Sequence, residues 1–279
     1  MQNEPKRQHW VPKTYLRRFS PDGDGVHVYD TLKRREFFAS MDKVLVQKHL
    51  YTIGAKNPAP LYTVEETLSK FETWASPSLE CLADGKSINS NPTLRRYFAV
   101  FLSTLLMRNP RLMNLQEKYL GQAEELRSPS AAITPEEYEE VANWYRSLDV
   151  EGRHIFYVRS ILDTALALAE DILNKKWNLF CAAQGFFLTS DNPLVVFHPS
   201  EAPHGIGTPG VQIHIAITPK ILLLIGSEVD LDDGTLHSMP QKMVDYINYF
   251  TAWRAERYIV SHRPFGSSES TIQAARKDI

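Results

Sequence analysis

The residues best suited to chemistry lie in two short segments that are far apart in the sequence. His9 stands beside Trp10, directly before a predicted helix that begins at Pro12. A histidine held by bulky neighbours at a helix entrance can act as an acid or base, contact an anion or ligate a metal. The second segment, residues 189–193 with the sequence TSDNP, offers two hydroxyls, a carboxylate and an amide within one turn. These groups suit the binding of a metal, a phosphate or a sugar.

Each segment also has a structural interpretation. His9 could bond a backbone carbonyl and only anchor the chain. Asp191 or Asn192 could form an Asx turn with its own backbone before Pro193. Both interpretations stay open from the sequence.

Arg108 is a further candidate because it continues an apolar stripe. Tyr97, Phe101 and Leu105 recur at helical spacing before it, which puts a permanent positive charge at the edge of a core. A buried charge needs a partner, and Glu72 on the preceding predicted helix is our first choice. We therefore expect a buried Arg108 paired with Glu72. Alternatively, the guanidinium is an anion clamp, since it recognises phosphate or carboxylate bidentately.

Basic residues gather near the N-terminus. Lys13, Arg17 and Arg18 share the polar side of the first predicted helix, and Lys6 and Arg7 precede it. The cluster could contact a nucleic-acid backbone, but a solvated helix face is the more common explanation.

The chain has no glycine-rich phosphate loop, no His-Glu-x-x-His, no Cys-x-x-Cys and no Gly-x-Ser-x-Gly, which excludes the easily recognised forms of several enzyme classes.

The composition is that of an ordinary soluble globular protein. Of the 279 residues, 43% are hydrophobic and 23% are charged, and the formal net charge is -2. This charge gives no general attraction to nucleic acid or to an anionic membrane. The two cysteines do not suggest a metal site or a disulfide framework. No signal peptide is recognised and the apolar run at 221–225 is too short to span a bilayer, so we expect a cytoplasmic protein without membrane contact.

The hydrophobic pattern predicts strands, then helices, then strands. Paired strands are expected at 26–30 and 35–39, with an extended piece at 44–53. Helices follow at 64–82, from Asn91-Pro92 to Arg108, and at 112–126, 134–148 and 153–174. Strands at 177–183 and 186–190 are expected to form a hairpin through Gln184-Gly185, followed by strands at 194–197, 211–218 and 221–225. A helix at 241–256 and a strand at 258–261 complete the pattern.

These elements predict an α+β fold in which a helical middle block, about 64–174, packs on a mostly antiparallel sheet built from N-terminal and C-terminal strands. The N-terminal strands are too few to be stable alone, so we expect them to join the later sheet. We expect a single domain over 1–264 and a loose polar tail over 265–279. His214 alternates with Ile213 and Ile215, so its side chain should point to the opposite face of the sheet from theirs.

Two stretches carry a family resemblance. Residues 9–20, HWVPKTYLRRFS, resemble the opening motif of an uncharacterised bacterial family known as domain of unknown function 4238, and residues 187–193, FLTSDNP, are similar to its Phe-Ile-Thr-Ser-Asp-Asn-Pro. Weaker similarities are RNPR at 108–111 and the helix at 248–257. The resemblance covers almost the whole chain. It emphasises these residues and implies no established activity.

The function we expect first is a hydrolase acting on a phosphodiester or nucleotide. His9, Asp191 and Glu72 would be its catalytic residues, with His9 and Asp191 also the candidate ligands of a divalent metal. Arg108, Asn192, Ser190 and Lys13 would bind the substrate. The kind of family that the chain resembles suggests a nuclease-type effector in bacterial defence or toxicity.

The alternative is a non-catalytic binding module for a nucleotide, a nucleic acid or a protein partner. The two hypotheses differ in geometry, because catalysis requires the acid–base groups to converge in one open cleft. For the hydrolase we expect His9 and Asp191 to line the same pocket, with Asn192 and Arg108 near its wall.

Overall fold

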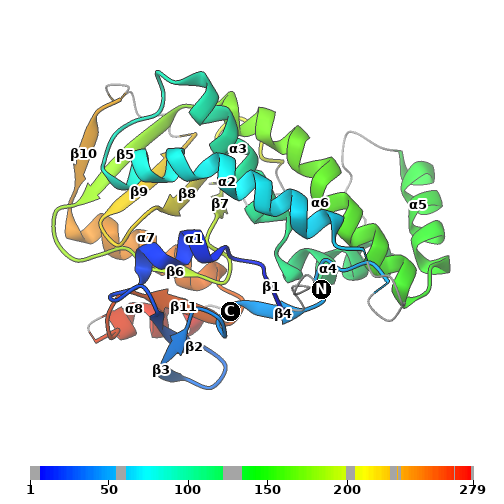
Figure 1. Cartoon of the computed structure of the whole chain (residues 1–279), viewed down its shortest axis with the longest axis horizontal. Helices are drawn as coiled ribbons and strands as arrows, with labels where there is room; N and C mark the ends of the chain where they lie inside the picture. Colours follow the sequence, from blue (N-terminus) through cyan, green and yellow to red (C-terminus); the bar gives the residue numbers. More distant parts are fainter. Residues whose placement is uncertain are drawn as a thin grey trace, which may run out of the picture.

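The structure of the protein is a computed structural model that describes residues 7–54, 61–121, 134–198, 205–226, 231, 234–266 and 268–277. It has the predicted α+β fold (Figure 1). The N-terminal elements are β1 (Arg7–His9), α1 (Lys13–Leu16), η1 (Arg17–Phe19), β2 (Gly25–Asp30), β3 (Arg35–Ser40) and β4 (Val46–Lys48). The helical middle contains α2 (Thr63–Ala83), α3 (Pro92–Met107), α4 (Pro110–Gln116), η2 (Glu117–Gly121), α5 (Pro135–Ser147) and α6 (Val150–Leu173). The C-terminal elements are β5 (Trp177–Ala182), β6 (Thr189–Ser190), β7 (Val195–Phe197), β8 (Gln212–Ala216), β9 (Ile221–Ile225), β10 (Leu236–Met239), α7 (Gln241–Arg254), β11 (Tyr258–Ser261) and α8 (Ser268–Lys277).

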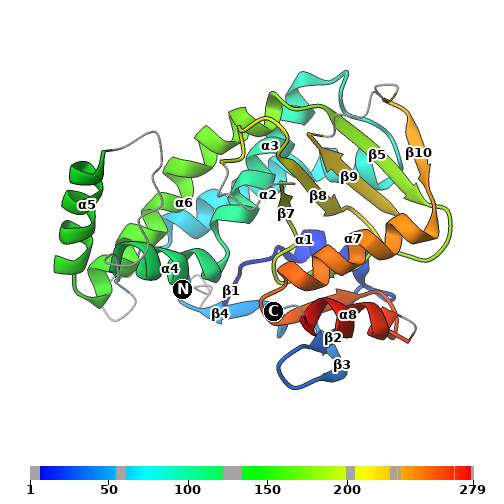
Figure 2. The ribbon, with the colours of Figure 1, turned by 180° about the vertical axis from the view of Figure 1, so that it is seen from behind.

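The strands form two main sheets. The larger sheet has the order β10-β5-β9-β8-β7 and is antiparallel except between β10 and β5. Helices α2 and α3 lie over one face of it, and α7 crosses the other face (Figures 1 and 2). The second sheet has the antiparallel order β3-β2-β11-β6 and lies beside α7 and α8 (Figure 2). Strands β1 and β4 form a separate pair.

Helix ends follow the predicted capping signals. Asn91 accepts a hydrogen bond from the N–H of Leu94, and Pro92 occupies the first turn of α3. Helix α3 ends at Met107, and Asn109 caps α4 by accepting a hydrogen bond from the N–H of Arg111. The Asn109-Pro110 pair thus separates α3 from α4. The predicted helix at 112–126 corresponds to α4 and η2, and its positions 122–126 lie outside the described residues.

The N-terminal hairpin joins a C-terminal strand, as the sequence predicted. Strand β2 pairs with β3 along its whole length and with β11 on its other side. The expectation of one common sheet was wrong, however, because β2, β3, β6 and β11 form a sheet of their own. The apolar side chains of the helical block instead pack against the five-stranded sheet, with Phe98 of α3 meeting Trp177 of β5 edge to face at 6.1 Å between ring centroids.

The predicted hairpin of residues 177–190 is also wrong. Strand β5 pairs with β9 and β10, whereas β6 pairs with β11 in the other sheet. The Gln184-Gly185 turn is present, but Phe186, Phe187 and Leu188 after it are all buried. These three apolar residues connect one sheet to the other, and their side chains are buried in the protein core. Strand β10, which no sequence signal predicted, takes the place beside β5.

The expectation of a loose tail after Pro264 was wrong as well. Residues 268–277 form α8, whose Ile272 and Ala275 are fully buried in a small core with Phe265 and Ala252. The two apolar positions are three residues apart and lie on one helical face. Two apolar positions in an otherwise polar stretch were too weak a pattern to predict this helix.

Candidate functional site

The two motif segments meet the end of α3 at one place. The indole Nε1 of Trp10 donates to the backbone oxygen of Asp191 at 3.1 Å, and Asn109 Nδ2 donates to the same oxygen at 3.2 Å. Arg108 Nε donates to the backbone oxygen of Trp10 at 2.8 Å. We call Trp10, Arg108, Asn109 and Asp191 the motif junction. Segments that are far apart in the sequence are thus held together there by side chain to backbone bonds.

The carboxylate of Asp191 is buried and accepts three backbone hydrogen bonds. Oδ1 accepts from the N–H of Glu256 at 2.9 Å, and Oδ2 accepts from the N–H groups of Arg257 and Tyr258 at 2.7 and 2.8 Å. Burial raises the pKa of this carboxyl to about 6, although the three N–H groups act in the opposite direction. The side chain therefore fixes the connection between α7 and β11.

Ser190 and Asn192 flank Asp191 and are engaged in the same region. Ser190 Oγ accepts from the N–H of Asn192 at 3.1 Å, which is a local turn bond. Asn192 Nδ2 donates to the backbone oxygen of Arg254 at 3.2 Å. The Asx turn considered above is therefore replaced, because the side chains of Asp191 and Asn192 bond the backbone of residues 254–258.

His9 and Lys13 face a different part of the chain. His9 Nε2 donates to the backbone oxygen of Met41 at 2.9 Å, and Lys13 forms an ion pair with Asp42. Burial lowers the pKa of His9, and the nearby charge of Lys13 acts in the same direction, so the imidazole is neutral near pH 7. These contacts correspond to the structural interpretation of His9. The opening segment converges with the TSDNP turn, but the side chains of His9 and Asp191 are directed to separate partners.

Arg108 is buried and paired with Glu72, as predicted. Its Nη1 lies 2.7 Å from Glu72 Oε1, and its side chain is 2% exposed. Tyr51 donates from its hydroxyl to the backbone oxygen of Arg108 at 2.9 Å. Burial raises the pKa of the neighbouring Glu65 to about 7, against the lowering effect of Arg108. Arg108 thus pairs with Glu72 of α2 and ties α2, α3 and the opening segment together.

A cavity of about 250 Å³ lies beside the motif junction, where α3 and α4 approach β7 and the end of α7. Its polar lining comprises Asn109, Arg111, Asn192 and Arg254, and all four lie in segments that carry the family resemblance. We call this cavity the arginine cleft. Its apolar lining consists of Leu106, Leu112, Leu115, Leu194 and Val196. Neither His9, nor Asp191, nor Arg108 lines it.

The charges in the arginine cleft are unevenly matched. Arg111 Nη1 forms an ion pair with Glu256 Oε1 at 2.8 Å. The guanidinium of Arg254 lies over the ring of Trp253 at 4.3 Å from its centroid, and among the described residues it has no carboxylate partner. Burial and the charge of Arg111 both lower the pKa of Arg254. The cleft therefore contains two guanidinium groups that repel each other, with one carboxylate at its edge.

Neither Arg111 nor Arg254 was among the predicted site residues. Both segments, 108–111 and 248–257, were recognised by resemblance, yet within them only Arg108 was given a role. An arginine in the first turn of a helix, or in the last turn of another, carries no signal of its own because both positions are usually solvated. Only the fold brings these two arginines to one cavity.

Two further features bear on the expected ligands. Over the described residues, no three side chains of the types His, Cys, Asp and Glu come close enough to hold a metal ion. Over the same residues, no helix has both the length and the apolar character needed to cross a bilayer.

Comparison with known proteins identifies the family. Neither curated proteins nor solved structures gave a match to the chain. The family model described as Protein of unknown function (DUF4238) matches residues 7–265, a span that contains the motif junction and the whole arginine cleft. It ends before α8 begins. The chain therefore belongs to the DUF4238 family.

Proposed function

We propose that the protein is a binding module for an anionic ligand, a nucleotide or a phosphodiester, and that the ligand's phosphate binds in the arginine cleft. The observation that carries the proposal is the half-buried guanidinium of Arg254, which faces Arg111 without a carboxylate partner among the described residues. A phosphate between the two would relieve their repulsion and accept charge-assisted hydrogen bonds. The amides of Asn109 and Asn192 supply further donors at the same wall.

The size of the arginine cleft limits what enters it. Pockets that enclose a whole small-molecule ligand usually measure about 300–1,000 Å³, whereas this cavity measures about 250 Å³. A phosphate and the atoms next to it fit, and the rest of a nucleotide or oligonucleotide would lie outside. This geometry suits a ligand recognised through its backbone phosphate more than through its base.

Binding is favoured over hydrolysis because the expected acid–base groups are elsewhere. Asp191 is held by three backbone N–H groups and His9 by a backbone carbonyl. Hydrolysis stays a second candidate, and one observation supports it: the carboxylate of Glu256 lies beside Arg111 at the edge of the cleft. There it could orient a water molecule toward a bound phosphodiester. A nuclease-type role in bacterial defence, a protein partner and a cytoplasmic location stay predictions.

The binding proposal predicts that Arg254→Ala weakens phosphate binding by about 10- to 100-fold. This range corresponds to the loss of one charge-assisted hydrogen bond, worth about 1.5–3 kcal/mol. Binding of AMP, pyrophosphate and a short single-stranded oligonucleotide would be measured by isothermal titration calorimetry. Arg263→Ala is the matched control, because Arg263 also lies over an aromatic ring, at 4.2 Å from the centroid of Phe186, but is outside the cleft.

The control variant should bind like the wild type. If none of the three anions binds the wild type, or if Arg254→Ala and Arg263→Ala bind equally well, the proposal is wrong. Thermal melting of both variants shows whether any loss of binding reflects unfolding.

The hydrolysis candidate makes a separate prediction for Glu256→Gln. If Glu256 orients the attacking water, the variant should retain AMP and oligonucleotide binding but lose at least about 100-fold in the rate of phosphodiester cleavage. Cleavage of a labelled oligonucleotide would be followed with and without divalent ions. Glu170→Gln, an exposed change on α6, serves as the control. Equal rates for the two variants, or no cleavage by the wild type, would leave binding as the function.

A further inference from the structure

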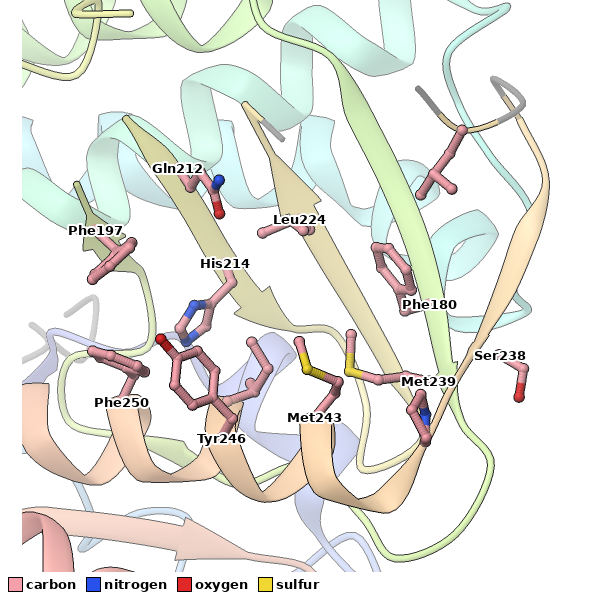
Figure 3. Close-up of a pocket in the computed structure, with 13 residues that line it drawn as sticks. Phe180, Phe197, Gln212, His214, Leu224, Ser238, Met239, Met243, Tyr246 and Phe250 are labelled. Atoms are coloured by element: carbon pink, nitrogen blue, oxygen red, sulfur yellow. The ribbon is translucent and has the colours of Figure 1, made fainter. Parts of the chain in front are cut away.

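A second cavity, of about 350 Å³, lies on the far side of the five-stranded sheet from α2 and α3 (Figure 3). Helix α7 forms one wall with Met243, Tyr246, Ile247 and Phe250, which are spaced by three and four residues and so share one helical face. Met243 and Tyr246 are about half exposed and mark the mouth of the cavity. We call this cavity the sheet pocket.

The sheet forms the opposite wall. Phe180 of β5, Leu224 of β9 and Phe197 of β7 line the pocket from this wall (Figure 3). Phe197 and Phe250 meet edge to face across the pocket, with 5.1 Å between ring centroids. The sheet pocket is therefore lined mainly by aromatic and aliphatic side chains, the environment that apolar small molecules prefer.

His214 is the one buried polar residue among the described residues that line the sheet pocket. It projects from the middle of β8 into the sheet pocket, while Ile213 and Ile215 pack in the core on the other face, as the alternation in the sequence predicted (Figure 3). Its Nε2 is buried and has no hydrogen-bond partner among the described residues. Burial lowers the pKa of His214 to about 3, so the ring is neutral near pH 7. Leaving a buried polar atom without a partner is unfavourable, and a ligand group that bonds to it removes this penalty.

Charge further restricts the class of ligand. None of the described side chains that line the sheet pocket is a lysine, arginine, aspartate or glutamate. Transfer of an ionised group into such surroundings is strongly unfavourable without a counter-charge. The other polar lining residues, Gln212, Ser238 and Tyr246, also carry neutral hydrogen-bonding groups. The ligand is therefore expected to be uncharged.

We propose that the sheet pocket binds an uncharged aromatic molecule whose single hydroxyl or carbonyl group bonds to Nε2 of His214. The four aromatic side chains offer edge and face contacts to a ring. Met239 and Met243 can adjust to its outline, since methionine side chains are flexible and polarisable. The site is separate from the arginine cleft and takes a ligand of opposite character.

Three naphthalene probes test the proposal with the full chain. 2-Naphthol carries the neutral hydroxyl, naphthalene lacks it, and 2-naphthoate replaces it with a charge. Fluorescence titration of the wild type should give saturable binding of naphthol, binding of naphthalene that is about three- to tenfold weaker, and no binding of naphthoate. The ratio of the first two reflects one neutral hydrogen bond, worth about 0.5–1.5 kcal/mol.

Variants locate the binding. His214→Leu should reduce naphthol affinity to the naphthalene level while naphthalene still binds, which also shows that the pocket is folded. His237→Leu is the matched control, because His237 Nε2 is likewise buried with no hydrogen-bond partner in the described part of the chain, but His237 does not line the pocket. Met243→Trp, at the half-exposed mouth, should block both probes.

The proposal fails if no probe binds saturably, if naphthoate binds as well as naphthol, or if His214→Leu leaves the preference for naphthol unchanged. It also fails if Met243→Trp has no effect, because the probes would then bind elsewhere. Arg254→Ala should leave naphthol affinity unaltered. The outcome is thus independent of whether the arginine cleft binds an anion.

Discussion

Replacing Arg108 with alanine is expected to lower the free energy of unfolding by about 3–5 kcal/mol, which is the usual cost of breaking a buried ion pair by removing one partner. The change would leave the carboxylate of Glu72 without its 2.7 Å partner and the backbone oxygen of Trp10 without a donor. The Glu72 side chain is 24% exposed and can recover some hydration, so the lower half of this range is expected. Urea denaturation followed by tryptophan fluorescence would measure the difference.

Arg146→Ala provides a matched control for this experiment. Arg146 and Glu139 are also 2.7 Å apart, but their side chains are 30% and 46% exposed. Solvent screening should limit the loss there to less than about 1 kcal/mol. Equal losses of unfolding free energy for the two variants would show that the burial of Arg108 does not increase the strength of its ion pair. Unchanged stability of Arg108→Ala together with lost AMP binding would instead make Arg108 a ligand-binding residue.

The position of Arg108 was predictable because it follows from a local pattern. Helical periodicity placed it in line with buried residues of α3, and a buried arginine requires a carboxylate, of which Glu72 was the nearest candidate. The same kind of reasoning located most helices, the capping residue Asn91 and the helix break at Asn109-Pro110. It depends only on side chains that are close in sequence or on neighbouring elements.

The partners of Asp191 could not be predicted in this way. They are backbone N–H groups of residues 256–258, and every residue except proline has such a group. No side-chain pattern marks the few that converge on a distant carboxylate. The division of the strands into two sheets could not be predicted either. The pairing of β6 with β11 depends on a run of apolar residues that would fit a hairpin equally well.

The arginine cleft shows the same limit for function. Asn192, which lines the cleft, and Arg108, which is next to the cleft residue Asn109, were predicted site residues. Arg111 and Arg254, in contrast, lie on helices that are far apart in the sequence. Each is an ordinary charged residue in its own helix. Their significance arises from their proximity in space, which raises the electrostatic cost of the pair unless an anion is present.

Asp191 gives the second large effect. Asp191→Asn is expected to lower the free energy of unfolding at pH 7 by about 1–3 kcal/mol, which is the usual cost of an unsatisfied buried group, because one acceptor oxygen is replaced by an amide donor that faces a backbone N–H. The matched control is Asp163→Asn, an exposed change on α6 that should have almost no effect. Denaturant melts of the three proteins at pH 7 would measure both differences.

The pH dependence of stability gives an independent check on the same carboxyl. Its pKa is about 6 in the fold, above the value near 3.9 of an unfolded chain. A raised carboxyl pKa adds stability that is fully present below pH 4 and is lost as the pH rises through 6. The wild type should therefore lose this contribution between pH 4 and 6, and Asp191→Asn should not.

If Asp191→Asn instead has wild-type stability at every pH but abolishes oligonucleotide cleavage, Asp191 is a catalytic base. The hydrolase hypothesis would then outrank the binding proposal, because the three backbone hydrogen bonds would serve to position a reactive carboxylate rather than to fix the connection between α7 and β11.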